Sequence, residues 1–182
     1  MDWYSILKFV HVAAAVCWVG GGVVLMYLGV LAGRAKDTDA QMTVIKQTAS
    51  LALAWFVPAS MATLIFGLAV ATIGNKWGEA WVILGLFGFA ATFVTGNFVI
   101  RPTADAIAKA ESEGKRDMAV SYGNKLLGIA KFDYVMLFTV IADMVLKPQW
   151  YDVTLMIVMA VVLVIGAGLF LLPSLTRKPA MA

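Results

Sequence analysis

Long apolar runs separated by short polar segments set the pattern of this sequence. A helix needs about 20 residues to cross a hydrocarbon core of about 30 Å. None of the apolar runs alternates with a period of two, as the strands of a membrane β-barrel do. The sequence therefore predicts an all-α integral membrane protein, one bundle over residues 1–182. Its five transmembrane helices are expected at residues 3–33, 48–73, 80–100, 131–146 and 153–172.

The longest polar stretch lies between the third and fourth apolar runs. Residues 103–124 combine helix-forming residues with charges of both signs, a composition typical of a helix in water. We expect a short cytoplasmic helical arm there, with Pro102 ending the third transmembrane helix. Pro58 lies inside the second run, where it removes one backbone hydrogen bond, so a local kink is expected at that point.

The amino-acid composition and the placement of the charges indicate which partners to expect. The chain is 62% hydrophobic and 14% charged, whereas a soluble domain is about half apolar and about a quarter charged. The formal net charge is +3, but the cations lie in the short segments between apolar runs and form no nucleic-acid module. The expected partner is the lipid bilayer, and nucleic acid is not expected.

The distribution of lysine and arginine predicts the orientation. Only Lys8, Lys76 and Lys147 fall on the side of the N-terminus. Cytoplasmic loops are enriched in these residues, so the N-terminus is expected outside and the C-terminus in the cytoplasm. Eleven cations fall on the cytoplasmic side: Arg34, Lys36, Lys46, Arg101, Lys109, Lys115, Arg116, Lys125, Lys131, Arg177 and Lys178.

His11 is the first candidate for chemistry, because it is the only histidine and lies inside the first apolar run. It follows Trp3 by eight residues, which places it about 12 Å along the helix. Small residues on its face allow a second helix or a flat cofactor to approach closely. The residues that share or extend this face include Ala14, Ala15, Trp18, Gly21 and Gly22.

Asp143 is predicted to lie at a depth similar to His11. A carboxylate in lipid is costly unless it is paired, and His11 is the best partner at that height. Such a carboxylate would hold one ring nitrogen and leave the other free to bind a metal or a proton. The alternative is that His11 only forms a hydrogen bond between helices. Thioether ligands are a further option, at Met26, Met136 or Met144.

A second polar cluster is expected at the cytoplasmic end of the bundle. Asn97 and Arg101 are one turn apart on the third helix, and Asp133 enters the fourth helix near the same level. We interpret Arg101 and Asp133 as a structural ion pair. The sequence contains no motif of a hydrolase, and Gly20-Gly21-Gly22 lies in an apolar context, so it is expected to pack helices instead of binding phosphate.

The stretch from Leu7 to Gly21 resembles the first helix of several bacterial inner-membrane families. Its pattern, LK-x-x-H-x-x-x-x-x-x-W-x-GG, is similar to that of the copper-resistance protein D family and of the HemJ-type protoporphyrinogen oxidases. The segment from Asn97 to Pro102 also matches the N-x-x-x-R-P segment of an uncharacterised integral-membrane family, which is the best match. The resemblance implies a helical bundle in which His11 binds haem b or copper.

The sequence departs from these families in three ways. It has no second histidine for bis-histidine haem, no segment rich in histidine and methionine for copper, and a different pattern after Trp18. Three functions therefore stay open: redox or metal handling through His11, an accessory subunit of a homo-oligomer or larger membrane complex, and a small proton-coupled transporter or channel that uses His11 and Asp143. The sequence does not decide whether the protein is an enzyme.

Overall fold

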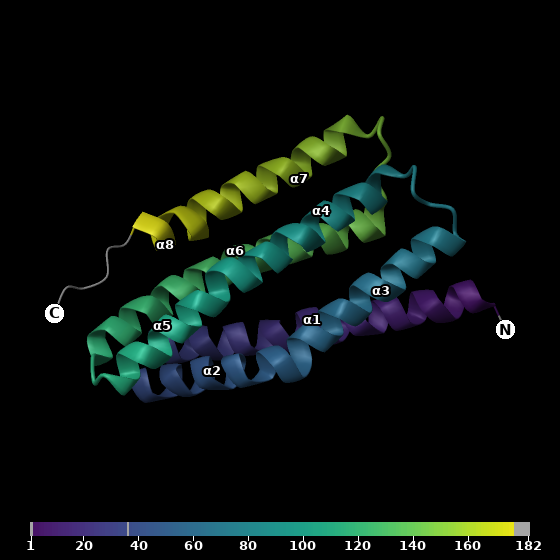
Figure 1. Cartoon of the computed structure of the whole chain (residues 1–182). Helices are drawn as coiled ribbons and strands as arrows, with labels where there is room; N and C mark the ends of the chain where they lie inside the picture. The colour runs from purple at the N-terminus through teal and green to yellow at the C-terminus, as the bar shows by residue number, and fades with distance from the viewer. Residues whose placement is uncertain (1, 36, 177–182) are drawn as a thin grey trace.

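The computed structural model describes residues 2–35 and 37–176, and every regular element in these two ranges is a helix. The elements join into five long helical segments (Figure 1). In chain order they are α1 (Trp3–Arg34), then α2 (Thr38–Leu51), η1 (Ala52–Phe56) and α3 (Val57–Ile73), then α4 (Ala80–Thr95), η2 (Gly96–Ile100) and α5 (Arg101–Ser112), then α6 (Arg116–Leu146), and finally α7 (Val153–Gly166), η3 (Ala167–Leu171) and α8 (Leu172–Thr176).

Four of the described helices are long and apolar enough to cross a membrane. They are Trp3–Arg34, Ala54–Ile73, Ala80–Ser112 and Val153–Thr176. α6 has 31 residues, but its second half includes three charged residues, Lys131, Asp133 and Asp143. The prediction of an all-helical chain with several apolar helices is therefore confirmed.

The polar segments differ from the prediction in their extent. Residues 38–51 are helical as α2 and continue into α3, so the second helix begins well before residue 48. The predicted helical arm is present as a hairpin of α5 and the first half of α6, but it is not a separate element. The third apolar helix continues without a break into α5, and α6 begins at Arg116 and not near residue 131.

Three prolines coincide with local widening of the helices. The π-helical segments η1, η2 and η3 end two residues before Pro58, Pro102 and Pro173, respectively. A proline has no N–H group and collides with the carbonyl group four residues earlier, and a π turn accommodates both effects. At Pro58, where the sequence predicts a kink, the helix is irregular, because η1 lies just before the proline. Pro102 does not end the third helix, because η2 absorbs the proline and the helix continues.

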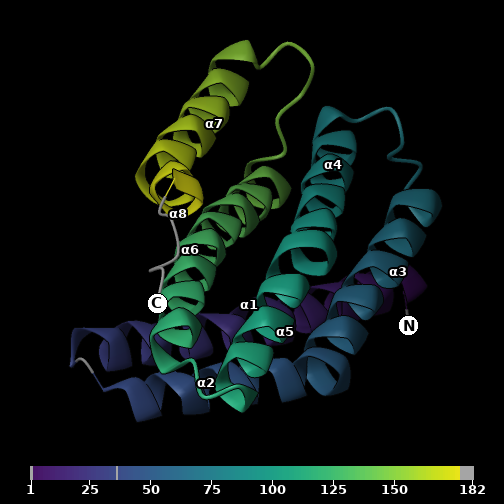
Figure 2. The same ribbon diagram turned by 60° about the vertical axis from the view of Figure 1, so that its left-hand side comes forward.

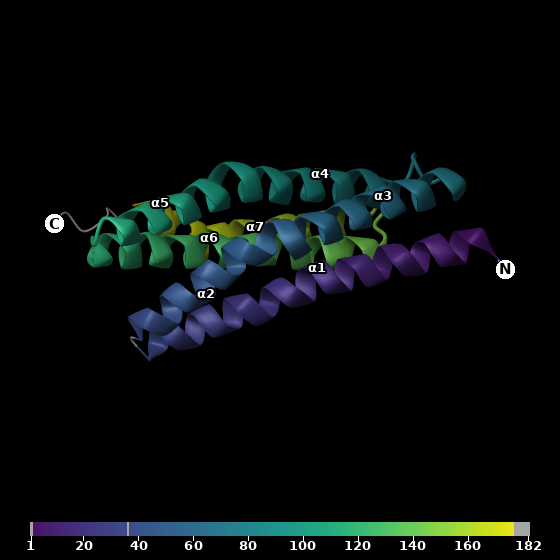
Figure 3. The same cartoon turned by 60° about the horizontal axis from the view of Figure 1, so that its bottom comes forward.

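α6 is the central helix of the bundle. It contacts α1, α2, α4, α5, α7, η3 and α8, whereas α1 packs mainly on α3. Figures 2 and 3 show the same arrangement from two sides, with α1 and the α2–α3 segment in one layer and α4, α5, α6 and α7 beyond it. In Figure 2, α7 is set apart from α4, on the far side of α6.

The end of the bundle formed by α2, α5 and the start of α6, called the arm end below, has its own apolar core. Lys46 on α2 forms an ion pair with Glu111 on α5 at 2.8 Å, and Arg116 on α6 pairs with Asp39 on α2. These contacts hold α2 beside the α5–α6 hairpin. The tail cations Arg177 and Lys178 lie outside the described residues. The core consists of Met42, Ile107, Ala110, Ala119 and Leu126.

The opposite end of the bundle, called the N-terminal end, contains the start of α1 and two loops, residues 74–79 and 147–152. The side chain of Asp2 caps α1 by accepting hydrogen bonds from the backbone N–H groups of Tyr4 and Ser5. The two loops are joined, because Trp150 Nε1 donates to the Gly78 carbonyl oxygen at 2.9 Å. The start of α4 and the end of α6 therefore lie at the same level.

Candidate functional site around His11

The imidazole of His11 is held by a backbone carbonyl group of the neighbouring helix α3. His11 is half-buried, and its Nδ1 lies 2.7 Å from the carbonyl oxygen of Thr63. A carbonyl oxygen only accepts hydrogen bonds, so Nδ1 carries the proton and donates it. The neutral ring consequently has its lone pair on Nε2, the arrangement that a metal-binding histidine needs.

Gly67 makes room for the ring. A Cβ atom on Gly67 would lie 2.8 Å from Cε1 of His11 and 2.9 Å from Nδ1, closer than real Cβ contacts come. The same relation recurs one heptad away, where a Cβ on Gly74 would lie 2.9 Å from Cε2 of Tyr4. α1 and α3 therefore meet in an antiparallel register that sets a ring of α1 against a glycine of α3.

The predicted pair of His11 and Asp143 is not formed. Asp143 is only 2% exposed and faces α4, where a Cβ on Gly85 would lie 3.4 Å from its Oδ2. Within residues 2–35 and 37–176, neither carboxylate oxygen of Asp143 has a hydrogen-bond partner. His11 instead has the carbonyl group of Thr63, so similar depth did not bring the two side chains together.

The other residues predicted on the His11 face serve helix packing. Trp18 reaches Phe89 of α4 in an edge-to-face contact, with ring centroids 5.7 Å apart. A Cβ on Gly21 would lie 3.2 Å from Nε1 of Trp55, and that nitrogen donates to the carbonyl oxygen of Cys17. These residues set how closely α1 approaches its neighbours.

Gly22 receives a side chain from α6. The phenol oxygen of Tyr134 occupies the position where a Cβ on Gly22 would lie. Gly22 is buried, so the contact joins the first helix to the central one. Of the two explanations for small residues on this face, an approaching helix or a flat cofactor, a helix accounts for Gly22.

The predicted ion pair between Arg101 and Asp133 is not present among the described residues. Arg101 is exposed, and Oδ1 of Asp133 is buried without a hydrogen-bond partner in that part of the chain. Asn97 donates to the carbonyl oxygen of Phe93 in its own helix at 2.9 Å. The π turn η2 ends directly before Arg101 and changes the direction of the side chains that follow it, which spacing in the sequence does not reveal.

The protein ligands available for a metal ion are few. No group of three His, Cys, Asp or Glu side chains that could hold a metal ion occurs within residues 2–35 and 37–176. His11 is therefore a single nitrogen donor, and its Nε2 can fill one position on a metal whose other ligands come from elsewhere.

Sequence reasoning missed the residues of α3 that position His11. Thr63 contributes a main-chain atom, which no side-chain pattern reveals. Gly67 could have been found from its spacing: Tyr4 and His11 are seven residues apart, as are Gly67 and Gly74. Matched spacing of rings and glycines on consecutive antiparallel helices predicts such contacts.

Comparison with known proteins identifies the family. Residues 5–148 match the family described as predicted integral membrane protein (DUF2269). The match covers more than half of the chain, so the chain belongs to this family and is an integral membrane protein. No curated protein matches the chain, and no solved structure matches it.

Proposed function

We propose that this member of the predicted integral membrane protein family DUF2269 binds haem b in the inner membrane of a bacterium, and that Nε2 of His11 would hold the haem iron. The observation that carries the proposal is the hydrogen bond from Nδ1 of His11 to the Thr63 carbonyl oxygen. It fixes the tautomer and orients the ring, as the outer partners of metal-bound histidines do.

The donor set favours haem over a copper ion. A copper ion takes several ligands from the protein, and the described residues offer no group of three His, Cys, Asp or Glu side chains for it. Haem brings four nitrogen ligands of its own and needs only one or two from the protein. Bound haem supplies one-electron redox chemistry. Because the chain has one histidine, bis-histidine ligation would require a second copy, which connects the proposal with a homo-oligomer.

We also propose five transmembrane helices. The second half of α6 lies against α4, with Val140 filling the space beside Gly88 and Met144 the space beside Gly85. Because the helix Ala80–Ser112, which begins with α4, is long and apolar enough to cross the membrane, a helix packed along it at the same level crosses the same layer. The charges of Lys131, Asp133 and Asp143 explain why composition alone does not identify this span.

The orientation that fits is the N-terminus outside and the C-terminus in the cytoplasm. The arm end carries most of the lysines and arginines that lie outside the apolar helices, and only Lys8, Lys76 and Lys147 fall at the N-terminal end. This asymmetry follows the positive-inside rule. His11 then lies nearer to the outer surface than to the cytoplasm.

The experiment is an absorption spectrum of the protein purified from haem-replete cells. We expect a Soret band in the wild type and its loss in His11→Gly. Imidazole added to His11→Gly should restore the band, because the free base can occupy the space left by the side chain. Absence of a Soret band in the wild type would refute haem binding. An undiminished band in His11→Gly would refute the role of His11.

A second candidate function is proton-coupled transport or conduction, and Asp143 favours it. An ionisable residue inside a membrane helix is costly and usually serves transport, and the carboxylate of Asp143 is buried without a hydrogen-bond partner among the described residues. Because His11 and Asp143 are not paired, this function would rest on Asp143 in the α4–α6 interface and not on a relay between the two residues.

Proteoliposomes test this second function. With a membrane potential imposed, entry of protons is followed with a pH-sensitive dye in the lumen. We expect Asp143→Asn to abolish proton entry, whereas Asp105→Asn, which changes an exposed carboxylate on α5, should leave it unchanged. Equal proton entry in the wild type and in Asp143→Asn would exclude this function.

A further inference from the structure

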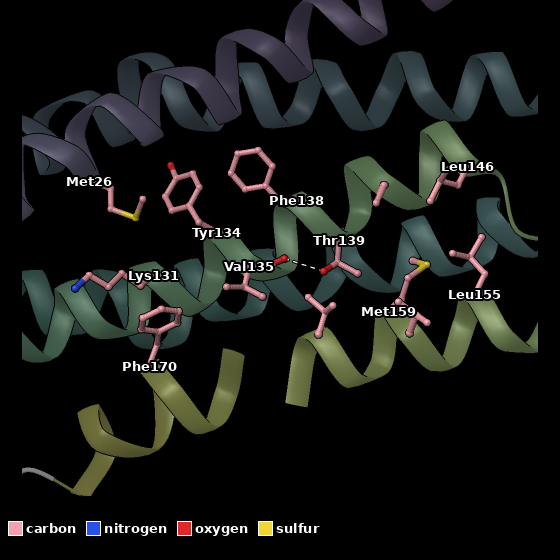
Figure 4. A pocket seen from close by; sticks show the side chains of 13 residues that line it. Met26, Lys131, Tyr134, Val135, Phe138, Thr139, Leu146, Leu155, Met159 and Phe170 are labelled. Atoms are coloured by element: carbon pink, nitrogen blue, oxygen red, sulfur yellow. Dashed lines mark hydrogen bonds between the residues drawn. The ribbon is translucent and has the colours of Figure 1, made fainter. Parts of the chain in front are cut away.

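A groove runs between α6 and α7 and has a volume of about 550 Å³ (Figure 4). Its walls come from α6, from α7 and η3, and at one end from α1. This volume lies in the range of sites for small molecules. The lining residues include Lys131, Thr139, Ala142, Leu146, Leu155 and Phe170.

The groove has one charged group, Lys131, at the end of the groove that is nearer to the arm end. Lys131 lies there beside Phe170 and Met26, and Leu146 and Leu155 lie at the far end (Figure 4). Within the residues that the structure describes, Lys131 has no ion pair. The hydroxyl of Thr139 donates to the carbonyl oxygen of Val135 at 2.8 Å and is therefore occupied. The groove is thus apolar along its length and has one cation, the ammonium group of Lys131, at one end.

The dimensions of the groove decide what fits it. Lys131 and Leu146 are fifteen residues apart on α6, which corresponds to about 22 Å along the helix axis. Apart from Lys131 and the hydroxyl groups of Tyr134 and Thr139, its lining is apolar. A single hydrocarbon chain matches this lining and length, because it is slender and apolar and extends along the groove from Lys131.

We propose that the groove between α6 and α7 binds one acyl chain of an anionic phospholipid, whose phosphate contacts Lys131. The apolar walls hold the chain and the ammonium group selects the charge of the head group. With the arm end in the cytoplasm, the lipid belongs to the inner leaflet, where anionic lipids attract basic residues. The proposal is independent of haem binding, because His11 is not among the residues that line the groove.

The test compares two lipids with identical acyl chains, phosphatidylglycerol and phosphatidylcholine, added to the purified protein in detergent. Binding is measured by native mass spectrometry and by the shift in Tm. We expect tighter binding of phosphatidylglycerol to the wild type, and a loss of about fivefold in its affinity in Lys131→Gln. Lys125→Gln is the matched control, because Lys125 lies on the same helix outside the groove.

A second variant tests the groove itself. Ala142→Phe places a ring in the apolar part of the groove and should weaken binding of both lipids, while the protein keeps its size and helix content. Equal affinity of the two lipids for the wild type would refute the role of the cation. Unchanged binding in both Lys131→Gln and Ala142→Phe would show nonspecific lipid around the protein and refute the site.

Discussion

The hydrogen bond between His11 and Thr63 can be broken without touching either residue, by substituting Gly67 with alanine. The new Cβ atom would lie 2.8 Å from Cε1 of His11, and ordinary contact begins at 3.4 Å. The imidazole must therefore retreat by about 0.6 Å, a distance that disrupts close packing. Nδ1 then loses its good geometry with the Thr63 carbonyl oxygen, now at 2.7 Å.

The expected effect on haem follows from the loss of this outer partner. Loss of a hydrogen bond that orients a metal-bound histidine typically lowers metal affinity by about 10- to 100-fold, so the haem affinity of Gly67→Ala should fall by at least about tenfold. The matched control is Gly20→Ala, because nothing lies within 4 Å of its new Cβ atom. Both substitutions lower the conformational entropy of the unfolded chain by the same amount. Any difference in haem affinity between the two variants is therefore due to the contact of the new Cβ atom with His11.

The assay is a titration of apoprotein with haem, followed at the Soret band, for the wild type and both variants. Gly20→Ala should match the wild type. In the absence of haem, Gly67→Ala should also be less stable than Gly20→Ala by about 1–3 kcal/mol, the usual cost of overpacking. Equal haem affinity of the two variants would refute the role of the Thr63 hydrogen bond in positioning His11.

Three further predictions concern stability, measured as Tm in detergent. Gly22→Ala should lower the stability by about 1–3 kcal/mol, because its Cβ atom collides with the phenol oxygen of Tyr134, and adding Tyr134→Phe should restore part of the loss. Asp143→Ala should raise the Tm, because it removes a buried carboxylate without hydrogen-bond partners among the described residues; a lower Tm would contradict this. The side-chain amide of Gln149 donates a hydrogen bond to the carboxylate of Glu79, and this bond is the main cause of the lowered pKa of Glu79. The ionised carboxylate therefore stabilises the fold at neutral pH, and this stabilisation is lost as the pH falls through the lowered pKa. Gln149→Ala should weaken the pH dependence of the Tm between pH 7 and pH 3, and an unchanged pH dependence would refute the assignment.

The membrane character and the helices were predictable because apolar runs of this length have one stable form in lipid. Their extents were not. Residues 38–47 and 103–112 are polar, so hydropathy gives no reason to attach them to the spans, yet both continue apolar helices. What stabilises them is tertiary: Met42 of α2 is buried against the α5–α6 hairpin. These polar segments are stabilised as helices by apolar contacts with each other at the arm end, which only the folded structure shows.

Prolines limited the prediction in a different way. The rule that proline ends a helix assumes that the lost hydrogen bond and the steric clash have no local remedy. In this chain η1, η2 and η3 each precede a proline and widen the helix, and a helix continues beyond each proline. A π turn changes the direction of the side chains that follow it, and Arg101, the first residue after η2, is exposed and not paired with Asp133 among the described residues.

The partner of His11 shows what depth along a helix leaves undecided. Depth was calculated from the rise per residue, and it gives a level in the bundle but no direction around the helix axis. The direction follows from the neighbour that α1 selects, and α3 is selected by glycines that match the rings of Tyr4 and His11 at the same spacing. The imidazole of His11 is bound to α3 and therefore does not pair with Asp143. Asp143 lies in the α4–α6 interface, and its carboxylate oxygens have no hydrogen-bond partner among the described residues. His11 and Asp143 therefore lie in two separate helix interfaces. If the proposed functions hold, a variant at Gly67 should change haem binding without changing proton transport through Asp143.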